Sequence, residues 1–200
     1  MEWSDKELLA CFRMPGGFTI TGRTTSIRNV FVAAIVPVIR PTADEIRTVL
    51  HILELDPRDL RCSYCGDAFT EWDHLRPLVK DGKPTGYPSS IRNLVPSCGK
   101  CNQSKGKSDW KTWMLGAAPR APSIRKIPDL AQRIARLEEF ESWSKCVPLR
   151  VEQLVSPHLW QQYYALQEEI LQKMRNAQKL AAEIAREIKM RELDINSQHN

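Results

Sequence analysis

The 200-residue sequence has no uninterrupted apolar run long enough to cross a bilayer. Its longest apolar stretch, residues 30–39, is interrupted by Pro37 and has about half of the roughly 20 residues that a transmembrane helix needs. The charged N-terminus also lacks the apolar segment and the small-residue cleavage site of a secretory signal peptide. We therefore expect a cytoplasmic protein that does not contact a membrane and keeps its thiols reduced.

The composition has no strong bias either. Hydrophobic residues make up 42% of the chain and charged residues 26%, which excludes a collagen-like, mucin-like or largely disordered protein. The 29 Lys and Arg against 24 Asp and Glu leave a net charge of +5, a mild basic excess typical of proteins that meet phosphate groups. The length suffices for one ordinary domain or two small ones.

Six cysteines are the exception to this average composition. Two Cys-x-x-Cys pairs flank residues 66–97, and each pair lets two thiolates reach one ion from a tight turn. One pair alone is also typical of redox proteins, whereas two pairs favour a tetrahedral zinc site with four sulfur ligands. The predicted zinc ligands are Cys62, Cys65, Cys98 and Cys101. A site of four sulfurs is closed, so this zinc would only stabilise the fold. We interpret Cys11 and Cys146, which lie outside the pattern, as buried thiols.

Local signals predict helices on either side of the cysteine-rich block. Thr42 can cap a helix, Glu45 follows as its capping-box partner, and Asp56-Pro57 should end that helix. Asp129 should open a second helix that ends before the next proline.

The remaining segments are less regular or longer. Residues 1–40 contain short apolar runs that fit either strands or a buried helix. Residues 117–128 contain three prolines and three basic residues, which predicts an extended basic linker. From residue 159 to about 193, apolar residues recur every three or four positions, which predicts a long helix. Its apolar stripe needs a partner, either its own domain or a second copy of the chain, and we expect a homodimer.

Polar residues of catalytic type lie between and after the cysteine pairs. Asp73 and His74 are adjacent, so on a strand their side chains would point to opposite faces. Asn93 lies shortly before the second cysteine pair, and Asn102 directly follows it. Each of them has an ordinary structural explanation on its own, such as a surface pair, a turn or a helix cap.

Taken together, this order resembles the HNH endonucleases, in their four-cysteine zinc variant and of the restriction type. The resemblance covers about residues 60–113 and implies a ββα-metal fold, with a hairpin formed by residues 70–75 and 78–83 and a helix over residues 101–113. The third position of the motif is Asn102 rather than His, which also occurs in the family.

The resemblance implies a role for each motif residue. His74 would be the general base that deprotonates water, a task suited to a neutral imidazole at pH 7. Asp73 and Asn102 would bind a catalytic Mg²⁺ or Mn²⁺, and Asn93 would orient His74 by bonding nearby backbone. Hydrolysis by this mechanism would leave 5′-phosphate products.

Basic residues around the motif predict contacts to nucleic-acid phosphates. The candidates in and beside the motif are Arg76, Lys80, Lys83, Arg92, Lys100, Lys105 and Lys107. Arg23 and Arg28, in the polar segment 21–29, are candidates for reading base edges. Arg120, Arg125 and Lys126 in the linker could extend the phosphate track. Trp110 and Trp113 are expected in the core rather than stacked on bases.

These observations predict an α+β protein with a zinc-stapled nuclease core, mainly helical flanks and a long C-terminal helix. We divide it into an N-terminal arm and helix (1–60), the nuclease core (61–116) and a basic linker with a helical C-terminal region (117–200). The expected function is metal-dependent cleavage of double-stranded DNA in restriction or another phage defence. The alternatives are a non-catalytic zinc-stapled nucleic-acid-binding module and the nuclease subunit of a larger defence complex.

Overall fold

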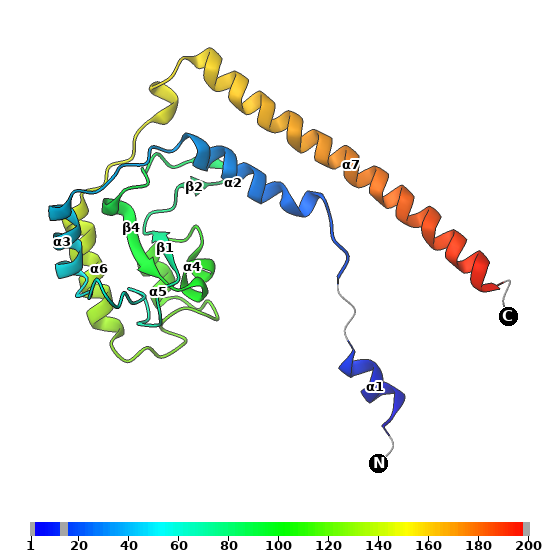
Figure 1. Ribbon diagram of the computed structural model, residues 1–200, viewed down its shortest axis with the longest axis horizontal. Helices are drawn as coiled ribbons and strands as arrows, with labels where there is room; N and C mark the ends of the chain where they lie inside the picture. Colours follow the sequence, from blue (N-terminus) through cyan, green and yellow to red (C-terminus); the bar gives the residue numbers. More distant parts are fainter. Residues whose placement is uncertain (1–2, 13–15, 198–200) are drawn as a thin grey trace. The chain divides into compact units, whose positions relative to one another are not determined.

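The structure is a computed structural model that describes residues 3–12 and 16–197 (Figure 1). It divides into two compact units, which are described separately. The first comprises the described parts of residues 1–27 and 164–200, and the second comprises Arg28–Tyr163. Helices and small two-stranded sheets give the α+β class that the sequence predicts.

The described part of the N-terminal segment contains helices rather than strands, but these helices are largely exposed and Val32 is the buried residue of the longest one, so the expected buried helix is not found. It contains α1 (Asp5–Cys11), the short 3-10 helix η1 (Thr21–Arg23) and α2 (Thr24–Ile35). Helix α1 starts at a capping box in which Ser4 and Glu7 satisfy each other's backbone amides. Cys11 is exposed, not buried as predicted.

The C-terminal helix α7 (Pro157–Ser197) is longer than the sequence pattern predicts. Leu171 and Gln167 lie on its buried side. Its other apolar side chains stay largely exposed, including Leu166, Leu180, Ile184 and Ile188. The predicted apolar stripe is therefore divided between a packed side and a solvent-facing side.

Helices α3 (Ala43–Ile52) and α6 (Leu130–Ser144) lie side by side in the second unit (Figure 1). The predicted capping box of α3 is confirmed, because Thr42 Oγ1 accepts a 3.2 Å hydrogen bond from Glu45 N and Glu45 Oε2 accepts a 3.0 Å bond from Thr42 N. The helix ends at Ile52, a little before Asp56-Pro57. The predicted start of α6 after Asp129 is also confirmed.

The two strands at the centre are β1 (Glu71–His74) and β4 (Leu94–Ser97), paired antiparallel with His74 opposite Leu94. The prediction that residues 78–83 pair with the first strand is therefore wrong. Those residues belong to a separate small sheet of β2 (Val79–Lys80) and β3 (Lys83–Pro84). Pairing of β1 with β4 is favoured because Val95 on β4 is fully buried in the core, whereas Lys80 and Lys83 are exposed.

The prediction of one helix over residues 101–113 is wrong. The structure has two helices there, α4 (Gly99–Lys105) and α5 (Trp110–Leu115). Gly106 ends α4 with a φ of +50° and a ψ of −122°, a positive-φ conformation that glycine adopts without a steric penalty. Asp109 then caps α5, where its Oδ1 accepts a 2.8 Å bond from Thr112 N. Trp110 and Trp113 are buried, as the sequence predicts.

Residues 117–128 form a series of turns, so the predicted extended linker is wrong. Ala121 is fully buried, and the backbone amide of Ser123 donates a 3.1 Å bond to Met114 O. The segment therefore packs onto the end of α5. The 3-10 helices η2 (Ile91–Asn93) and η3 (Val151–Gln153) complete the second unit.

One hydrophobic cluster holds the second unit together. It joins α3, the two cysteine pairs, the residue after β1, β4, α5 and α6. Its most deeply buried members are Cys62, Tyr64, Leu75, Val95, Cys101, Met114, Leu137 and Phe140. The core of this unit thus includes helices on both sides of residues 61–116. Among residues 3–12 and 16–197, no helix is long and apolar enough to cross a membrane.

Candidate functional site

The four predicted zinc ligands gather at one point, although they come from opposite ends of residues 62–101. Cys62, Cys65, Cys98 and Cys101 are all buried and unpaired by disulfides, and their sulfur atoms lie within 4.8 Å of one another. The sulfurs of Cys65 and Cys98 are 3.7 Å apart, close to the value of about 3.8 Å expected for a tetrahedron with Zn–S bonds of about 2.3 Å. The cluster therefore fits a structural zinc ion.

Backbone hydrogen bonds explain why the first cysteine pair turns toward the second. The amide of Gly66 donates a 2.8 Å bond to Cys62 O, and Gly66 has a φ of +79°, which favours glycine. The amide of Ser63 donates a 2.8 Å bond to Pro96 O, which ties this turn to β4 just before Cys98.

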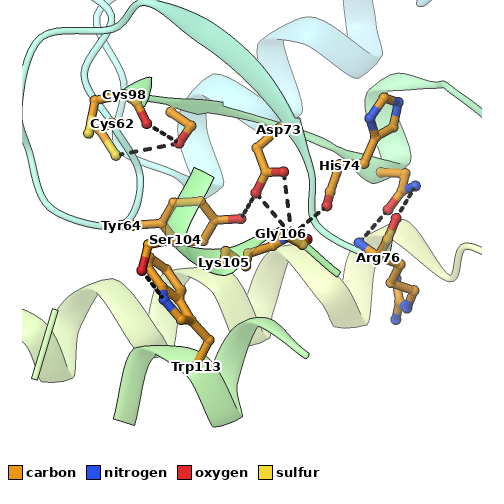
Figure 2. Close-up of polar contacts among 12 residues, drawn as sticks. Cys62, Tyr64, Asp73, His74, Arg76, Cys98, Ser104, Lys105, Gly106 and Trp113 are labelled. Atoms are coloured by element: carbon orange, nitrogen blue, oxygen red, sulfur yellow. Dashed lines mark hydrogen bonds and ion pairs between the residues drawn. The ribbon is translucent and has the colours of Figure 1, made fainter. Parts of the chain in front are cut away.

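Next to the zinc cluster, a buried polar network joins three elements (Figure 2). Tyr64 OH donates a 2.6 Å hydrogen bond to Oδ2 of Asp73. The Nζ of Lys105 lies 3.1 Å from the same oxygen and 3.3 Å from Oδ1, and it also donates a 3.0 Å bond to His74 O. Lys105 is 1% exposed and Asp73 5%, so the ion pair lies in the interior.

The pKa values of this network follow from its burial. Burial raises the pKa of Asp73, although Lys105 and Tyr64 act in the opposite direction. Burial also raises the pKa of the Tyr64 hydroxyl, and the neighbouring Asp73 charge adds to that effect. Tyr64 is therefore a hydrogen-bond donor at neutral pH rather than an acid.

His74 points away from Asp73, as expected for adjacent residues on a strand (Figure 2). Its Nε2 lies 2.9 Å from Ser89 Oγ, in the loop before η2. Burial, together with the positive charge of Lys105, lowers the pKa of His74 to about 4. The imidazole is therefore neutral at pH 7, the form that can accept a proton.

Asn93 is fully buried and fastens the chain just after β1. Its Oδ1 accepts a 2.8 Å bond from Arg76 N, and its Nδ2 donates bonds to Arg76 O at 2.9 Å and Pro88 O at 3.3 Å. These contacts fix the backbone on both sides of the imidazole, since Arg76 follows His74 in sequence and Pro88 precedes Ser89.

Asn102 lies in the first turns of α4, next to Cys101, and is half-buried. Helix α4 packs against β1, which carries Asp73 and His74. The motif residues thus sit on β1 (Asp73 and His74), at the end of η2 just before β4 (Asn93) and on α4 (Asn102), with β4 in place of the predicted second strand.

Comparison with known proteins points to a family for the cysteine-rich region. The family model described as HNH endonuclease matches residues 62–108. The chain contains an HNH endonuclease domain. A curated relative of the chain is the CRISPR-associated endonuclease Cas9 of Corynebacterium diphtheriae, 26% identical over 99 residues that cover 45% of this chain and 9% of the relative. The chain thus corresponds to a small part of that protein. No solved structure matches the chain significantly.

Three basic residues predicted to contact nucleic acid have structural partners in and around the HNH domain. Lys105 is buried in the ion pair with Asp73, so it does not reach a surface. Arg76 Nη2 lies 2.8 Å from Oε1 of Glu141, and Arg92 Nε lies 3.0 Å from Oε1 of Glu45. The two arginine contacts dock the HNH domain against α6 and α3, and of the three residues only Lys105 is buried where it cannot contact phosphate.

The other basic candidates are exposed, and several of them gather at the β2–β3 hairpin. Lys80 and Lys83 lie on its two strands, and the Arg28 side chain lies against Gly82 in the turn between them. Lys107 reaches the same turn, where its Nζ is 3.2 Å from Asp81 Oδ1. We call Arg28, Lys80, Lys83 and Lys107 the hairpin patch. Lys100 on α4 and Arg23 on η1 are exposed but lie on other elements.

Sequence reasoning missed Tyr64 and Ser89, and it predicted phosphate contacts rather than these positions for Lys105 and Arg125. Tyr64 and Lys105 hold Asp73, Ser89 contacts His74, and Arg125 contacts the zinc ligands. The sequence predicts a phosphate contact for Lys105 because it belongs to a dense group of basic residues beside the motif. Ser89 carries no local signal, since its role depends on how the loop before η2 folds over β1.

Proposed function

We propose that this protein is a divalent-metal-dependent endonuclease that hydrolyses phosphodiester bonds of double-stranded DNA. The observation that carries the proposal is His74, a half-buried imidazole that is neutral at pH 7 within an HNH domain. The neutral imidazole is the form that can take a proton, which is the task of a general base.

In the proposed mechanism His74 takes a proton from the attacking water. Its Nε2 is occupied by Ser89, which leaves Nδ1 as the nitrogen for this task. That assignment requires the tautomer in which Nε2 carries the hydrogen and donates it to Ser89 Oγ. Asn93 holds the backbone around the imidazole, so the ring keeps its direction as the water approaches.

Asp73 and Asn102 are the proposed protein ligands of a catalytic Mg²⁺ or Mn²⁺. A carboxylate and an amide oxygen have the hard donor chemistry that these ions prefer. The Asp73 carboxylate can accept about four contacts, and three of them are already made by Tyr64 and Lys105. A cation bound to Asp73 would therefore share the carboxylate with Lys105. When bound, the cation would stabilise negative charge on the scissile phosphate and on the departing 3′ oxygen, which implies 5′-phosphate products.

DNA is the proposed substrate because the curated relative is a CRISPR-associated endonuclease and because the hairpin patch presents cationic side chains beside the HNH domain. Lysine and arginine bind the phosphates of a duplex largely without regard to its sequence. Any recognition of bases would come from other parts of the chain, such as Arg23.

The direct test is to incubate the purified full chain with plasmid and phage DNA in the presence of Mg²⁺ or Mn²⁺ and to sequence the ends. Discrete fragments with 5′-phosphates are expected for a restriction-type enzyme, and a smear would indicate a nonspecific nuclease. His74→Ala should abolish cleavage but keep DNA binding. Cleavage at the wild-type rate by this variant would exclude His74 as the base.

A non-catalytic zinc-stapled binding module is the second candidate, favoured by the interior ion pair of Asp73 with Lys105. Such a module would bind DNA but would not cleave it in the presence of either Mg²⁺ or Mn²⁺. Absence of cleavage by the wild-type chain, with binding retained, would select this candidate.

We propose a role in restriction or another phage defence, in which two copies of the chain make one double-strand break. The exposed apolar side chains of α7, among them Leu166, Leu180 and Ile184, support pairing with a second copy or with another protein of a larger complex. Light scattering distinguishes these cases, because a homodimer has twice the 22.9 kDa mass of the chain. A monomer at micromolar concentration would contradict the homodimer.

A further inference from the structure

The turns of residues 117–128 bring an arginine onto the zinc cluster. Ser123 Oγ donates a 2.7 Å bond to Gly116 O, and the Arg125 amide donates a 3.0 Å bond to Ala121 O, so this segment has a defined backbone path. Arg125 Nη1 lies 3.4 Å from the sulfur of Cys101, and its Nη2 lies 2.9 Å from Oδ2 of Asp67. The Arg125 side chain is 23% exposed.

These contacts place a permanent positive charge against a buried negative one. A zinc ion with four thiolate ligands carries a net charge of −2, and Cys62 and Cys101 are fully buried. Hydrogen bonds to ionised groups are about twice as strong as neutral ones, and a low-dielectric surrounding strengthens them further. Arg133 approaches the same turn, but its Nη1 donates to the carbonyl oxygen of Cys62 at 3.1 Å rather than to a sulfur.

We propose that Arg125 is a positioning residue of the zinc site, whose hydrogen bond to the Cys101 sulfur offsets the charge of the four thiolates and slows the loss of zinc. This inference rests on the assignment of zinc to the cysteine cluster. It also extends the metal site beyond residues 62–108, which match the family model, to a segment that the sequence pattern assigns to a phosphate-binding linker.

Neighbouring cations in the same segment provide matched controls. Arg120 and Lys126 are exposed, and Arg120 lies in the same turns five positions before Arg125. If the segment acted only through its overall positive charge, Arg120→Gln and Arg125→Gln would have equal effects. The proposal requires that only Arg125→Gln acts on the metal.

The test uses the zinc-loaded full chain and measures the rate at which zinc passes to a metallochromic chelator. Residues that contact metal ligands typically change metal affinity by about 10- to 100-fold, so we expect Arg125→Gln to release zinc at least about 10-fold faster than the wild type. Arg120→Gln should release it at the wild-type rate. Equal release rates for Arg125→Gln and the wild type would overturn the proposal.

A spectroscopic measurement separates a direct effect on sulfur from a general loosening of the fold. With Co²⁺ in place of zinc, the sulfur-to-cobalt charge-transfer band should shift in Arg125→Gln and stay unchanged in Arg120→Gln. If Arg125→Gln does not fold, Arg125→Met takes its place, since it removes both the charge and the hydrogen bond to sulfur but keeps an apolar side chain of similar length. An unshifted band in the folded variant would overturn the proposal.

The wild-type control distinguishes this proposal from its premise. A purified wild-type chain without stoichiometric zinc would refute the zinc assignment itself. A wild-type chain that holds one zinc and an Arg125 variant that holds it equally well would refute only the role of Arg125. Neither result depends on whether the protein cleaves DNA.

Discussion

The ammonium group of Lys105 lies 3.1 Å from the carboxylate of Asp73, and both side chains are buried. This pair joins the end of α4 to β1, next to His74. Tyr64 completes it from within the first cysteine pair, so the same carboxylate links the zinc cluster to the proposed catalytic strand.

Breaking this pair from one side should destabilise the protein strongly. Lys105→Met leaves the Asp73 carboxylate buried without its cation, and loss of one partner of a buried ion pair typically costs about 3–5 kcal/mol. The double variant Asp73→Asn/Lys105→Met should recover part of that loss in urea unfolding, because no unpaired charge remains. Additive losses of the two single variants would show that the pair is not coupled.

The same variant tests whether Asp73 can hold a cation. In Lys105→Met the carboxylate has more free capacity, so Mg²⁺ should raise its melting temperature more than it raises that of the wild type. Asp73→Asn should show no such increase. An equal effect of Mg²⁺ on all three proteins would argue against Asp73 as a metal ligand.

Asn93→Ala should lower the free energy of unfolding by about 2 kcal/mol or more, because it leaves buried backbone groups of Arg76 and Pro88 without partners. Asn93→Asp, which keeps the acceptor but not the donors, should lie between Asn93→Ala and the wild type. Asn29→Ala, at an exposed position of α2, is the control and should change stability by about 0.5 kcal/mol or less. A similar loss in the Asn29 variant would contradict the special role of Asn93.

The hairpin patch should determine the salt dependence of DNA binding. Each of Lys80→Ala and Lys83→Ala removes one exposed cation and should lower the slope of log K against log salt by about one. Lys179→Ala on α7 is a control with the same change of charge at an exposed site outside the patch. If the salt slopes of the patch variants equalled that of the wild type, DNA would not bind at the hairpin patch.

The six cysteines should react with iodoacetamide in an order set by exposure and metal binding. Cys11 is exposed and should react first. Burial raises the pKa of the Cys146 thiol, so less of it is ionised and it should react more slowly than Cys11. Its reaction rate should continue to increase with pH above about 8.5, the ordinary pKa of a thiol. The four clustered cysteines should react only after a chelator removes zinc. Mass spectrometry of the peptides resolves each site, and early alkylation of Cys62 would contradict the metal cluster.

The sequence alone determined the features that depend on local spacing. Two tight turns with paired cysteines define a tetrahedral site wherever the chain brings them together, and the zinc ligands were assigned in this way. The capping box of Thr42 and Glu45 and the start of α6 after Asp129 are equally local, because their hydrogen bonds lie within one helical turn. The adjacency of Asp73 and His74 likewise determined that they face opposite ways on β1.

Only the tertiary structure decided which distant groups meet. The pairing of β1 with β4 depends on the burial of Val95, and the break between α4 and α5 depends on Gly106 and on the cap at Asp109. Lys105 and Arg125 look like solvated cations in the sequence, because nothing near them in the chain reveals an acidic or sulfur partner. Their partners come from residues 67, 73 and 101, and a charge is buried only where the fold supplies such a partner.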